Sequence, residues 1–171
     1  MAKYNRATRI GCHSNADVQW YLVAFGVLGA MSMDLDGGCH CGNLRVRLRL
    51  TRPPQEQTLR SCSCSFCRSH GTRTVSDPNG LFEVWAEDWS LVAPYRFGSR
   101  TADYLICRQC GVYVGAVCET SLGLRSVANI NALANRSDFS QDPVQPDYEG
   151  EAISDRLARR AANWMPALQH R

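Results

Sequence analysis

The sequence carries little net charge. Its 171 residues contain 19 Lys and Arg against 16 Asp and Glu, which gives a formal net charge of +3. Lys3, Arg6 and Arg9 against Asp17 place +2 of this charge in residues 1–33, so the remainder carries only about +1. A domain that binds DNA or RNA needs a basic face for the phosphate backbone. We therefore expect no nucleic-acid partner.

Long hydrophobic runs are also missing. The apolar stretch from Trp20 to Ala30 is too short to span a bilayer, so we expect no membrane partner. It would suit the hydrophobic part of a signal peptide, but Gly29 to Asp34 is a poor cleavage site and export would oxidise the cysteines. We expect residues 1–33 to be a leader outside the domain, and a mis-assigned start, with the natural protein beginning at Met33.

The sequence shows no internal repeat beyond its cysteine pairs, no low-complexity run and no glycine-rich phosphate loop. Its 44% hydrophobic and 20% charged residues are ordinary values for a globular protein. A chain of this length is most simply one domain with an appendage.

Cysteine is the residue in excess. Seven of the nine cysteines form three tight clusters: Cys39-His40-Cys41, Cys62-Ser63-Cys64-Ser65-Phe66-Cys67 and Cys107-Arg108-Gln109-Cys110. Thiolates one or two residues apart can converge on one metal ion, whereas cysteines separated by a single residue are too close for an unstrained disulfide. Metal binding is therefore favoured, and metal-held thiolates favour a reducing, cytoplasmic compartment. Four plus three thiolates make one complete tetrahedral set and one set that lacks a ligand.

From Asn43 onward the pattern is that of β-strands. In the clearest one, apolar residues alternate with arginines that we expect on a solvated face: Leu44, Arg45, Val46, Arg47, Leu48, Arg49 and Leu50. Asp77 to Gly80 is a strong turn signal. Short apolar runs follow at Leu81–Trp85, Tyr95–Phe97, Tyr104–Ile106, Val112–Cys118 and Leu124–Ile130. Many short strands with closely spaced turns predict an all-β sandwich or open barrel.

A short helix is expected near the C-terminus. Pro143 to Gly150 is a turn-rich linker, after which Ser154 can cap a helix that Pro166 ends. Its apolar face would carry Leu157, Ala161 and Trp164, and its arginines would face solvent: Arg156, Arg159 and Arg160.

The segment Cys107 to Gly111 is typical of a zinc knuckle, because the glycine permits a tight turn whose amides point at the sulfurs. A thioredoxin-like redox pair would need a helix starting inside the motif, and none is apparent. A knuckle needs two more ligands, and spacing alone does not identify them. Chain order favours Cys39 and Cys41, because the three-cysteine cluster then stays intact. His40 would be an exposed loop residue.

The three-cysteine cluster can hold one side of an ion and leave its fourth position open. His70 could close the site and make it structural; otherwise water or a thiol takes the position, with Ser63 and Ser65 donating hydrogen bonds to the sulfurs. Three thiolates overcompensate the charge of Zn²⁺, so a bound water should ionise well above the pH of about 7 seen with three histidines. Such a soft site suits binding a thiol as thiolate. Cys12 lies in the leader, and Cys118 is expected to be buried and inert.

Several of these motifs together resemble one family. Gly37 to Gly42, Cys62 to Arg68, Tyr95 to Ser99 and Cys107 to Gly111 are similar, in this order, to the motifs of the glutathione-dependent formaldehyde-activating enzyme family, which shares a domain with centromere-protein-V-like proteins. The resemblance covers residues 34–166.

The resemblance implies a mainly-β domain at residues 34–166: a β-tent of two antiparallel sheets pinned by zinc, with a short C-terminal helix. It implies two Zn²⁺ per chain. The structural ion would be held by Cys39, Cys41, Cys107 and Cys110, and the second, open-site ion by Cys62, Cys64 and Cys67. The activity it implies is joining formaldehyde to glutathione, formally a carbon–sulfur lyase reaction in reverse. No glutathione-recognition pattern is matched.

The leading hypothesis is a cytoplasmic, zinc-dependent carbon–sulfur lyase whose partners are a small-molecule thiol, such as glutathione, and an aldehyde. No general base is evident, although His70 and Tyr95 are conceivable proton carriers. The main rival is a non-catalytic two-zinc module that binds a partner protein through an apolar patch. A redox module similar to the β-tent sulfoxide reductases would need a reactive cysteine outside the zinc sets, which leaves Cys118 or Cys12.

Overall fold

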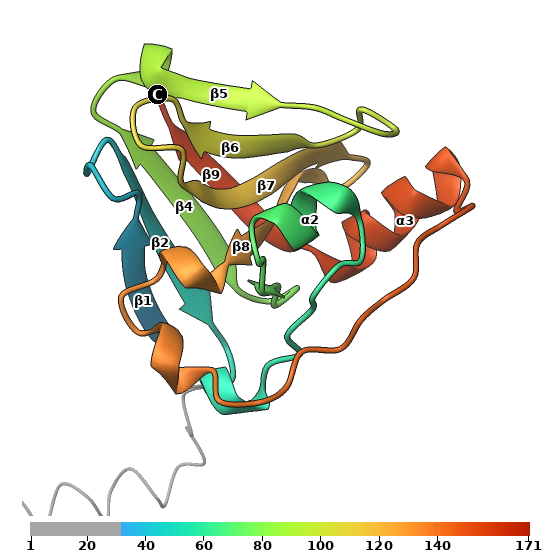
Figure 1. The fold of residues 1–171 in the computed structure, drawn as a ribbon. Helices are drawn as coiled ribbons and strands as arrows, with labels where there is room; N and C mark the ends of the chain where they lie inside the picture. The colour runs from blue at the N-terminus through green and yellow to red at the C-terminus, as the bar shows by residue number, and fades with distance from the viewer. Residues whose placement is uncertain (1–31) are drawn as a thin grey trace, which may run out of the picture. The chain divides into compact units, whose positions relative to one another are not determined.

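The computed structural model describes residues 32–171, whose strands form one nine-stranded sheet (Figure 1). The strand order is β1-β2-β4-β9-β8-β7-β6-β5, and β3 pairs with β8 at the side. The strands are β1 (Met33–Gly38), β2 (Leu44–Leu50), β3 (Thr74–Val75), β4 (Leu81–Ala86), β5 (Val92–Tyr95), β6 (Asp103–Cys107), β7 (Tyr113–Thr120), β8 (Gly123–Asn129) and β9 (Met165–His170).

Two α-helices accompany the sheet, α2 (Ser65–Ser69) and α3 (Ile153–Asn163). Four single-turn 3₁₀ helices lie in the connections: η1 (Pro54–Glu56), η2 (Trp89–Leu91), η3 (Ile130–Ala132) and η4 (Arg136–Asp138). Within residues 32–171, no helix has the length and apolar character needed to cross a membrane.

The sheet consists of two antiparallel halves that meet at β9. Strands β1, β2 and β4 form one half, and β5 to β8 form the other. The start of β9 pairs antiparallel with β8, at Met165 opposite Ser126, and its remainder pairs parallel with β4, at Ala167 opposite Phe82. The predicted mainly-β class with two antiparallel sheets is confirmed, and the one parallel pair makes the joined sheet mixed.

Strand β2 has the predicted alternation. Its four apolar residues are almost completely buried, and its arginines point outward. There Arg47 forms an ion pair with Asp36 at 2.8 Å, and Arg49 forms one with Asp34 at 3.0 Å. Both acids belong to β1, a strand that the sequence did not indicate. The arginines therefore form a solvated face paired with acids, as expected.

Two groups of apolar side chains hold the elements together. The main core lies between the two halves of the sheet and includes Leu48, Phe82, Val114, Ile130 and Met165. A smaller cluster forms around Tyr113, Ala116 and Val127, against which Phe66 of α2 and Trp164 after α3 pack. The two helices therefore pack against the half formed by β5 to β8 (Figure 1).

The turn expected at residues 77–80 is present. The Gly80 N–H donates to the Asp77 carbonyl oxygen at 2.8 Å. A Cβ atom at Gly80 would lie 2.3 Å from the Arg49 carbonyl oxygen, so only glycine fits there. The runs expected after it are strands, except that β5 ends at Tyr95 and Phe97 lies beyond it.

The expected C-terminal helix is present, but it begins and ends earlier than predicted. It ends at Asn163, and its N-cap is Ala152, not Ser154, with no side-chain cap. Residues 165–170 form β9 and include Pro166, which the sequence suggested would only end the helix. Both outcomes fit proline chemistry, because proline stops a helix and is accepted close to the start of a strand.

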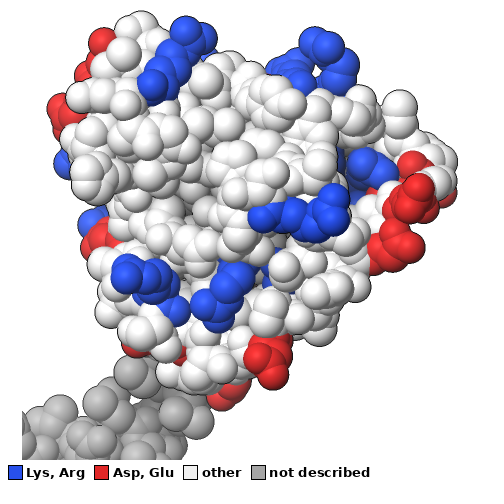
Figure 2. All heavy atoms as spheres, in the orientation of Figure 1, with Lys and Arg blue, Asp and Glu red and all other residues white. Residues whose placement is uncertain are grey.

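Arginine side chains of the described residues do not form a continuous basic surface on the face that carries α2. Figure 2 shows them as separate groups with uncharged surface between them. The absence of a nucleic-acid partner remains a prediction.

Candidate metal centres

Four cysteine sulfurs from two distant hairpin connections converge at one side of the sheet. Cys39 and Cys41 come from the β1–β2 connection, Cys107 is the last residue of β6, and Cys110 lies in the β6–β7 connection. All four sulfurs lie within 4.8 Å of one another, with 3.6 Å between Cys39 and Cys41 and 3.5 Å between Cys41 and Cys107. A tetrahedral site with zinc–sulfur bonds of about 2.3 Å has sulfur–sulfur edges of about 3.8 Å. This donor set fits a zinc ion.

Local backbone geometry aims these sulfurs. The Leu44 N–H donates to the Cys39 sulfur at 3.1 Å. In the knuckle, the Gly111 N–H donates to the Cys107 carbonyl oxygen at 2.8 Å, and Gly111 has a φ of 74°. That left-handed conformation favours glycine. His40 is exposed, as expected.

The four thiols perturb one another's ionisation. Burial opposes ionisation of Cys110, but the backbone N–H of Val112 and the neighbouring Cys107 and Cys41 thiols lower its pKa to about 6. For Cys41 the N–H of Asn43 acts in the lowering direction, yet burial and the adjacent thiols raise its pKa to about 12. Four thiolates held this close need a cation to balance their charge.

The three-cysteine cluster forms a second group. The sulfurs of Cys62, Cys64 and Cys67 lie within 4.8 Å of one another. Cys64 is the N-cap of α2, and its sulfur accepts a hydrogen bond from the Cys67 N–H at 3.4 Å. The short helix therefore directs two of the three sulfurs to the same side. The structure shows no hydrogen bond from Ser63 or Ser65 to these sulfurs, contrary to expectation.

One thiol of this group is readily ionised. A hydrogen bond from the Cys67 thiol lowers the pKa of Cys62 to about 5; burial opposes this, while the Cys64 N–H and the charge of Arg156 assist it. The same hydrogen bond and burial raise the pKa of Cys67. The group is therefore able to supply thiolate ligands near neutral pH.

None of the other cysteines or histidines considered as ligands joins the three-cysteine group within residues 32–171. His70 is exposed, and its Nδ1 lies 2.9 Å from the Phe66 carbonyl oxygen. Cys118 is buried, and its thiol donates to the Thr101 carbonyl oxygen at 2.8 Å. Cys12 lies outside the described residues. The fourth side of this site is therefore open to a ligand.

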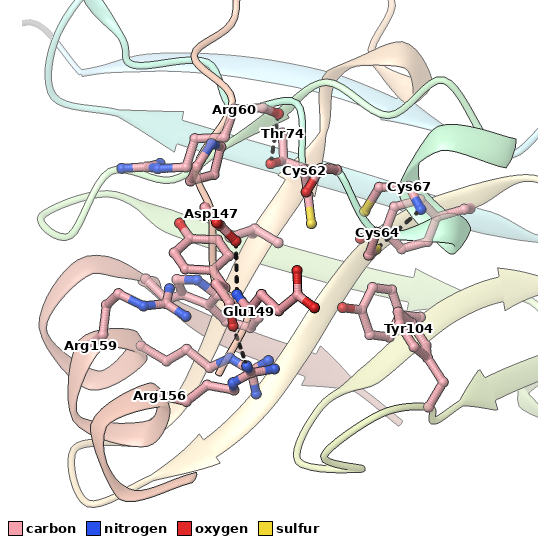
Figure 3. A pocket seen from close by; sticks show the side chains of 18 residues that line it. Arg60, Cys62, Cys64, Cys67, Thr74, Tyr104, Asp147, Glu149, Arg156 and Arg159 are labelled. Carbon is pink, nitrogen blue, oxygen red and sulfur yellow. Dashed lines mark hydrogen bonds between the residues drawn. The ribbon is translucent and has the colours of Figure 1, made fainter. Parts of the chain in front are cut away.

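A cavity of about 380 Å³ lies on that side (Figure 3). Its walls come from the cysteine cluster, the strands β6 to β8, the 146–149 segment and α3. The aromatic part of the wall is formed by Phe97, Tyr104, Tyr113, Tyr148 and Trp164. The conceivable proton carriers His70 and Tyr95 do not line it; they lie at a separate surface hollow beside Phe66.

The arginines of α3 face this cavity, so the expectation that they point to solvent was wrong. Arg156, Arg159 and Arg160 all line it. Arg156 and Arg159 share one carboxylate, that of Glu151, at 3.2 and 2.7 Å. Arg156 and Arg159 together exceed Glu151 by one positive charge, before the carboxylates of Asp147 and Glu149, which also line the cavity, are counted.

Arg160 adds a second positive charge. Its side chain is buried, with 6% exposure, and it donates to the Thr101 hydroxyl at 2.7 Å and lies 4.7 Å from the Trp164 ring. Among the described residues it has no carboxylate partner, and its Nε has no hydrogen-bond acceptor. Arg160 therefore brings a buried cation without a carboxylate partner to the cavity that the cysteine group also lines.

Sequence reasoning therefore missed the wall opposite the cysteines. A signal was present for α3: Arg156, Arg160 and Trp164 follow a spacing of four, which places them on one helix face. For Tyr104 and Glu149, which also line the cavity, no local pattern distinguishes them from other strand and loop residues.

The fold and the two cysteine groups fit a zinc-binding β domain. No family model matches the sequence. A crystal structure of a Rhodobacter sphaeroides protein, determined as a Northeast Structural Genomics target, is similar to this chain, with 28% sequence identity and a TM-score of 0.50. The match covers 66% of this chain and 100% of that one. This similarity supports the fold.

Proposed function

We propose that this chain is a zinc-dependent enzyme of the carbon–sulfur lyase type that handles a thiol–aldehyde adduct, resembling S-(hydroxymethyl)glutathione synthase in the formaldehyde-activating family. The observation that carries the proposal is the open three-cysteine group at the wall of a cavity of about 380 Å³. Cavities of roughly 300–1,000 Å³ are typical of small-molecule sites. Reduced thiols at both metal centres suit a cytoplasmic location.

The cavity suits a thiol as the nucleophile. Zinc held by Cys62, Cys64 and Cys67 would bind an incoming thiol as thiolate and keep its sulfur nucleophilic near neutral pH. The aromatic wall limits access of water to that sulfur. Holding the two reactants in one small cavity contributes through proximity and orientation.

The cavity also suits an anionic thiol. Four arginines line the cavity (Arg60, Arg156, Arg159 and Arg160), and the carboxylates at or beside it are three (Asp147, Glu149 and Glu151), so one positive charge is in excess before the thiolates are counted. Guanidinium groups bind carboxylates through paired hydrogen bonds, and glutathione carries two carboxylates. This is the recognition element that the sequence motifs did not contain.

An amine nucleophile is not available in the described domain. The single lysine of the chain is Lys3, so residues 32–171 contain no amine side chain that could form a Schiff base with an aldehyde. A Schiff base between an aldehyde and a lysine of the described domain is therefore excluded.

The test is a Cys64→Ser variant. Adduct formation should be measured at equilibrium by NMR exchange between free aldehyde and adduct, with the uncatalysed rate subtracted. We expect the catalysed exchange to disappear and the zinc content to fall from two ions per chain to about one, because one of three ligands is lost. Cys118→Ser is the matched control, since this thiol lies outside both groups. Unchanged exchange in Cys64→Ser would contradict the proposal.

A non-catalytic two-zinc module is the alternative. Tyr95 is 46% exposed and stacks with Phe66 and Phe97, which forms an aromatic surface that a partner protein could cover. The two functions differ in a cobalt-substituted sample. A spectral change on adding glutathione supports the enzyme, and no change supports the module.

A further inference from the structure

We propose that Tyr104 and Glu149 are the proton-transfer pair of the cavity, with Tyr104 donating a hydrogen bond to the aldehyde oxygen and Glu149 carrying the thiol proton to it. This inference rests on the proposed function and supplies the acid–base groups that the cysteine site itself lacks. Figure 3 shows both side chains pointing into the cavity that Cys62 and Cys64 line.

Tyr104 is held rigidly. Its ring, on β6, lies 4.8 Å from the Phe66 ring, 4.8 Å from the Phe97 ring and 5.7 Å from the Tyr113 ring, measured between centroids. Its hydroxyl makes no hydrogen bond to another residue in the described part of the chain, so its proton is free for a ligand. Burial, reinforced by the nearby cysteine group, raises the pKa of Tyr104, which keeps the hydroxyl protonated.

The backbone at Glu149 is held by its neighbours in the segment before α3, while its side chain is exposed. Its backbone N–H donates to the Asp147 carboxylate at 2.9 Å. The preceding Tyr148 is held by α3, because its carbonyl oxygen accepts from Arg156 at 2.9 Å and its ring lies 3.8 Å from the Arg159 guanidinium. The two arginines bind Glu151 instead of Glu149. The Glu149 carboxylate therefore has no ion-pair partner among residues 32–171 and remains free to accept a proton.

The proposed step balances without an oxidant or reductant. The thiol proton passes to the Glu149 carboxylate, the sulfur forms a bond to the carbonyl carbon, and the carbon–oxygen π bond breaks. Tyr104 donates a hydrogen bond to the oxygen as negative charge develops on it. Glu149 then gives its proton to that oxygen, which yields the hydroxymethyl thioether and restores the carboxylate.

Other polar groups fit these roles less well. His70 and Tyr95 lie outside the cavity. Tyr113 lines it but is only 3% exposed, whereas Tyr104 is partly exposed. Asp147 lines it as well, but its carboxylate accepts the Glu149 N–H.

The experiment uses Tyr104→Phe and Glu149→Gln, which remove only the hydroxyl or the charge. For each we expect the catalysed exchange rate to fall by about 10²-fold, the size typical of a lost acid–base group or oxyanion donor. Zinc content and the glutathione-induced spectral change of the cobalt form should stay as in the wild type, because neither residue is a metal ligand. The catalysed exchange rate of the double variant should lie only slightly below that of the less active single variant, since both groups serve one proton transfer.

Two matched variants serve as controls. Tyr95→Phe removes an exposed hydroxyl outside the cavity, and Glu56→Gln removes an exposed carboxylate on η1; both should retain full exchange. If Cys64→Ser is inactive while Tyr104→Phe and Glu149→Gln keep the wild-type rate, the pair is refuted and the proposed function stands. If the wild-type protein shows no catalysed exchange, both are refuted.

Discussion

Asp77 shows how one buried carboxylate can organise a turn. It is 2% exposed, and its two carboxylate oxygens accept from the Thr51 N–H at 2.8 Å, the Thr51 hydroxyl at 2.8 Å and the Asn79 N–H at 3.1 Å. Burial alone would raise its pKa, but these donors favour the charged form and leave the pKa below its ordinary value. The ionised side chain therefore fastens the end of β2 to the turn before β4.

We expect Asp77→Asn to lower the free energy of unfolding by about 2 kcal/mol at neutral pH, because charge-assisted hydrogen bonds become neutral ones. Since the folded-state pKa is depressed, this stabilisation is present above the unfolded pKa and is lost as the pH falls through the folded value. Urea unfolding should therefore show a difference in unfolding free energy between wild type and variant at pH 7. This difference should shrink below about pH 4. A gap that persists in acid, or an equal effect from the exposed Asp142→Asn control, would contradict this account.

At the scale of elements, one buried hydroxyl fastens the first residue of β9. The Ser76 hydroxyl accepts from the Met165 N–H at 2.7 Å and donates to the Ser126 carbonyl oxygen at 2.9 Å. It thereby joins the first residue of β9 to β8. All three positions are buried.

Replacing Ser76 with Ala leaves the Met165 N–H without an acceptor in a buried place. We expect a loss of about 1–3 kcal/mol in the free energy of unfolding, measured by denaturant titration. Ser140→Ala, at an exposed position, is the control and should change little. Equal stability of the two variants would show that the hydroxyl does not fasten β9.

The elements differ in how far the sequence predicts them. Strand β2 is predictable because its alternation of leucine and arginine is regular. Strand β1 is not, since its acids and glycines are poor strand formers and form a strand only opposite the β2 arginines. The direction of the α3 arginines was missed because charge was expected to face water, whereas here it faces the cavity with the thiolates. The cysteine pairing was foreseeable from chain order, but Tyr104 and Glu149 meet only in the fold.

For the whole molecule, the four-sulfur centre acts as a cross-link. Cys39 and Cys41 belong to one half of the sheet, and Cys107 and Cys110 belong to the other. A metal ion at this centre would connect segments about seventy residues apart and restrict the unfolded chain, as a disulfide does. The three-cysteine group lies within one short segment and cannot do this.

We therefore expect the two centres to differ in their effect on stability. Cys110→Ser should lose one zinc and more than about 4 kcal/mol of unfolding free energy, the range reached when a structural metal is lost. Cys64→Ser should also lose one zinc but unfold close to the wild type. Metal analysis with thermal unfolding checks both, and chelator treatment of the wild type should reproduce the larger effect. Equal destabilisation would contradict separate structural and functional centres.

The position of β9 also bears on how the protein is made. The strand that joins the two halves of the sheet, residues 165–170, follows all the other strands of the described sheet in the sequence. A ribosome adds about 5–20 residues per second, so both halves wait for seconds, with their edges beside β9 uncovered, until β9 has been synthesised. Exposed strand edges promote aggregation. A stalled or C-terminally clipped chain therefore becomes a substrate for chaperones and proteases, even though it already contains every cysteine of both metal centres.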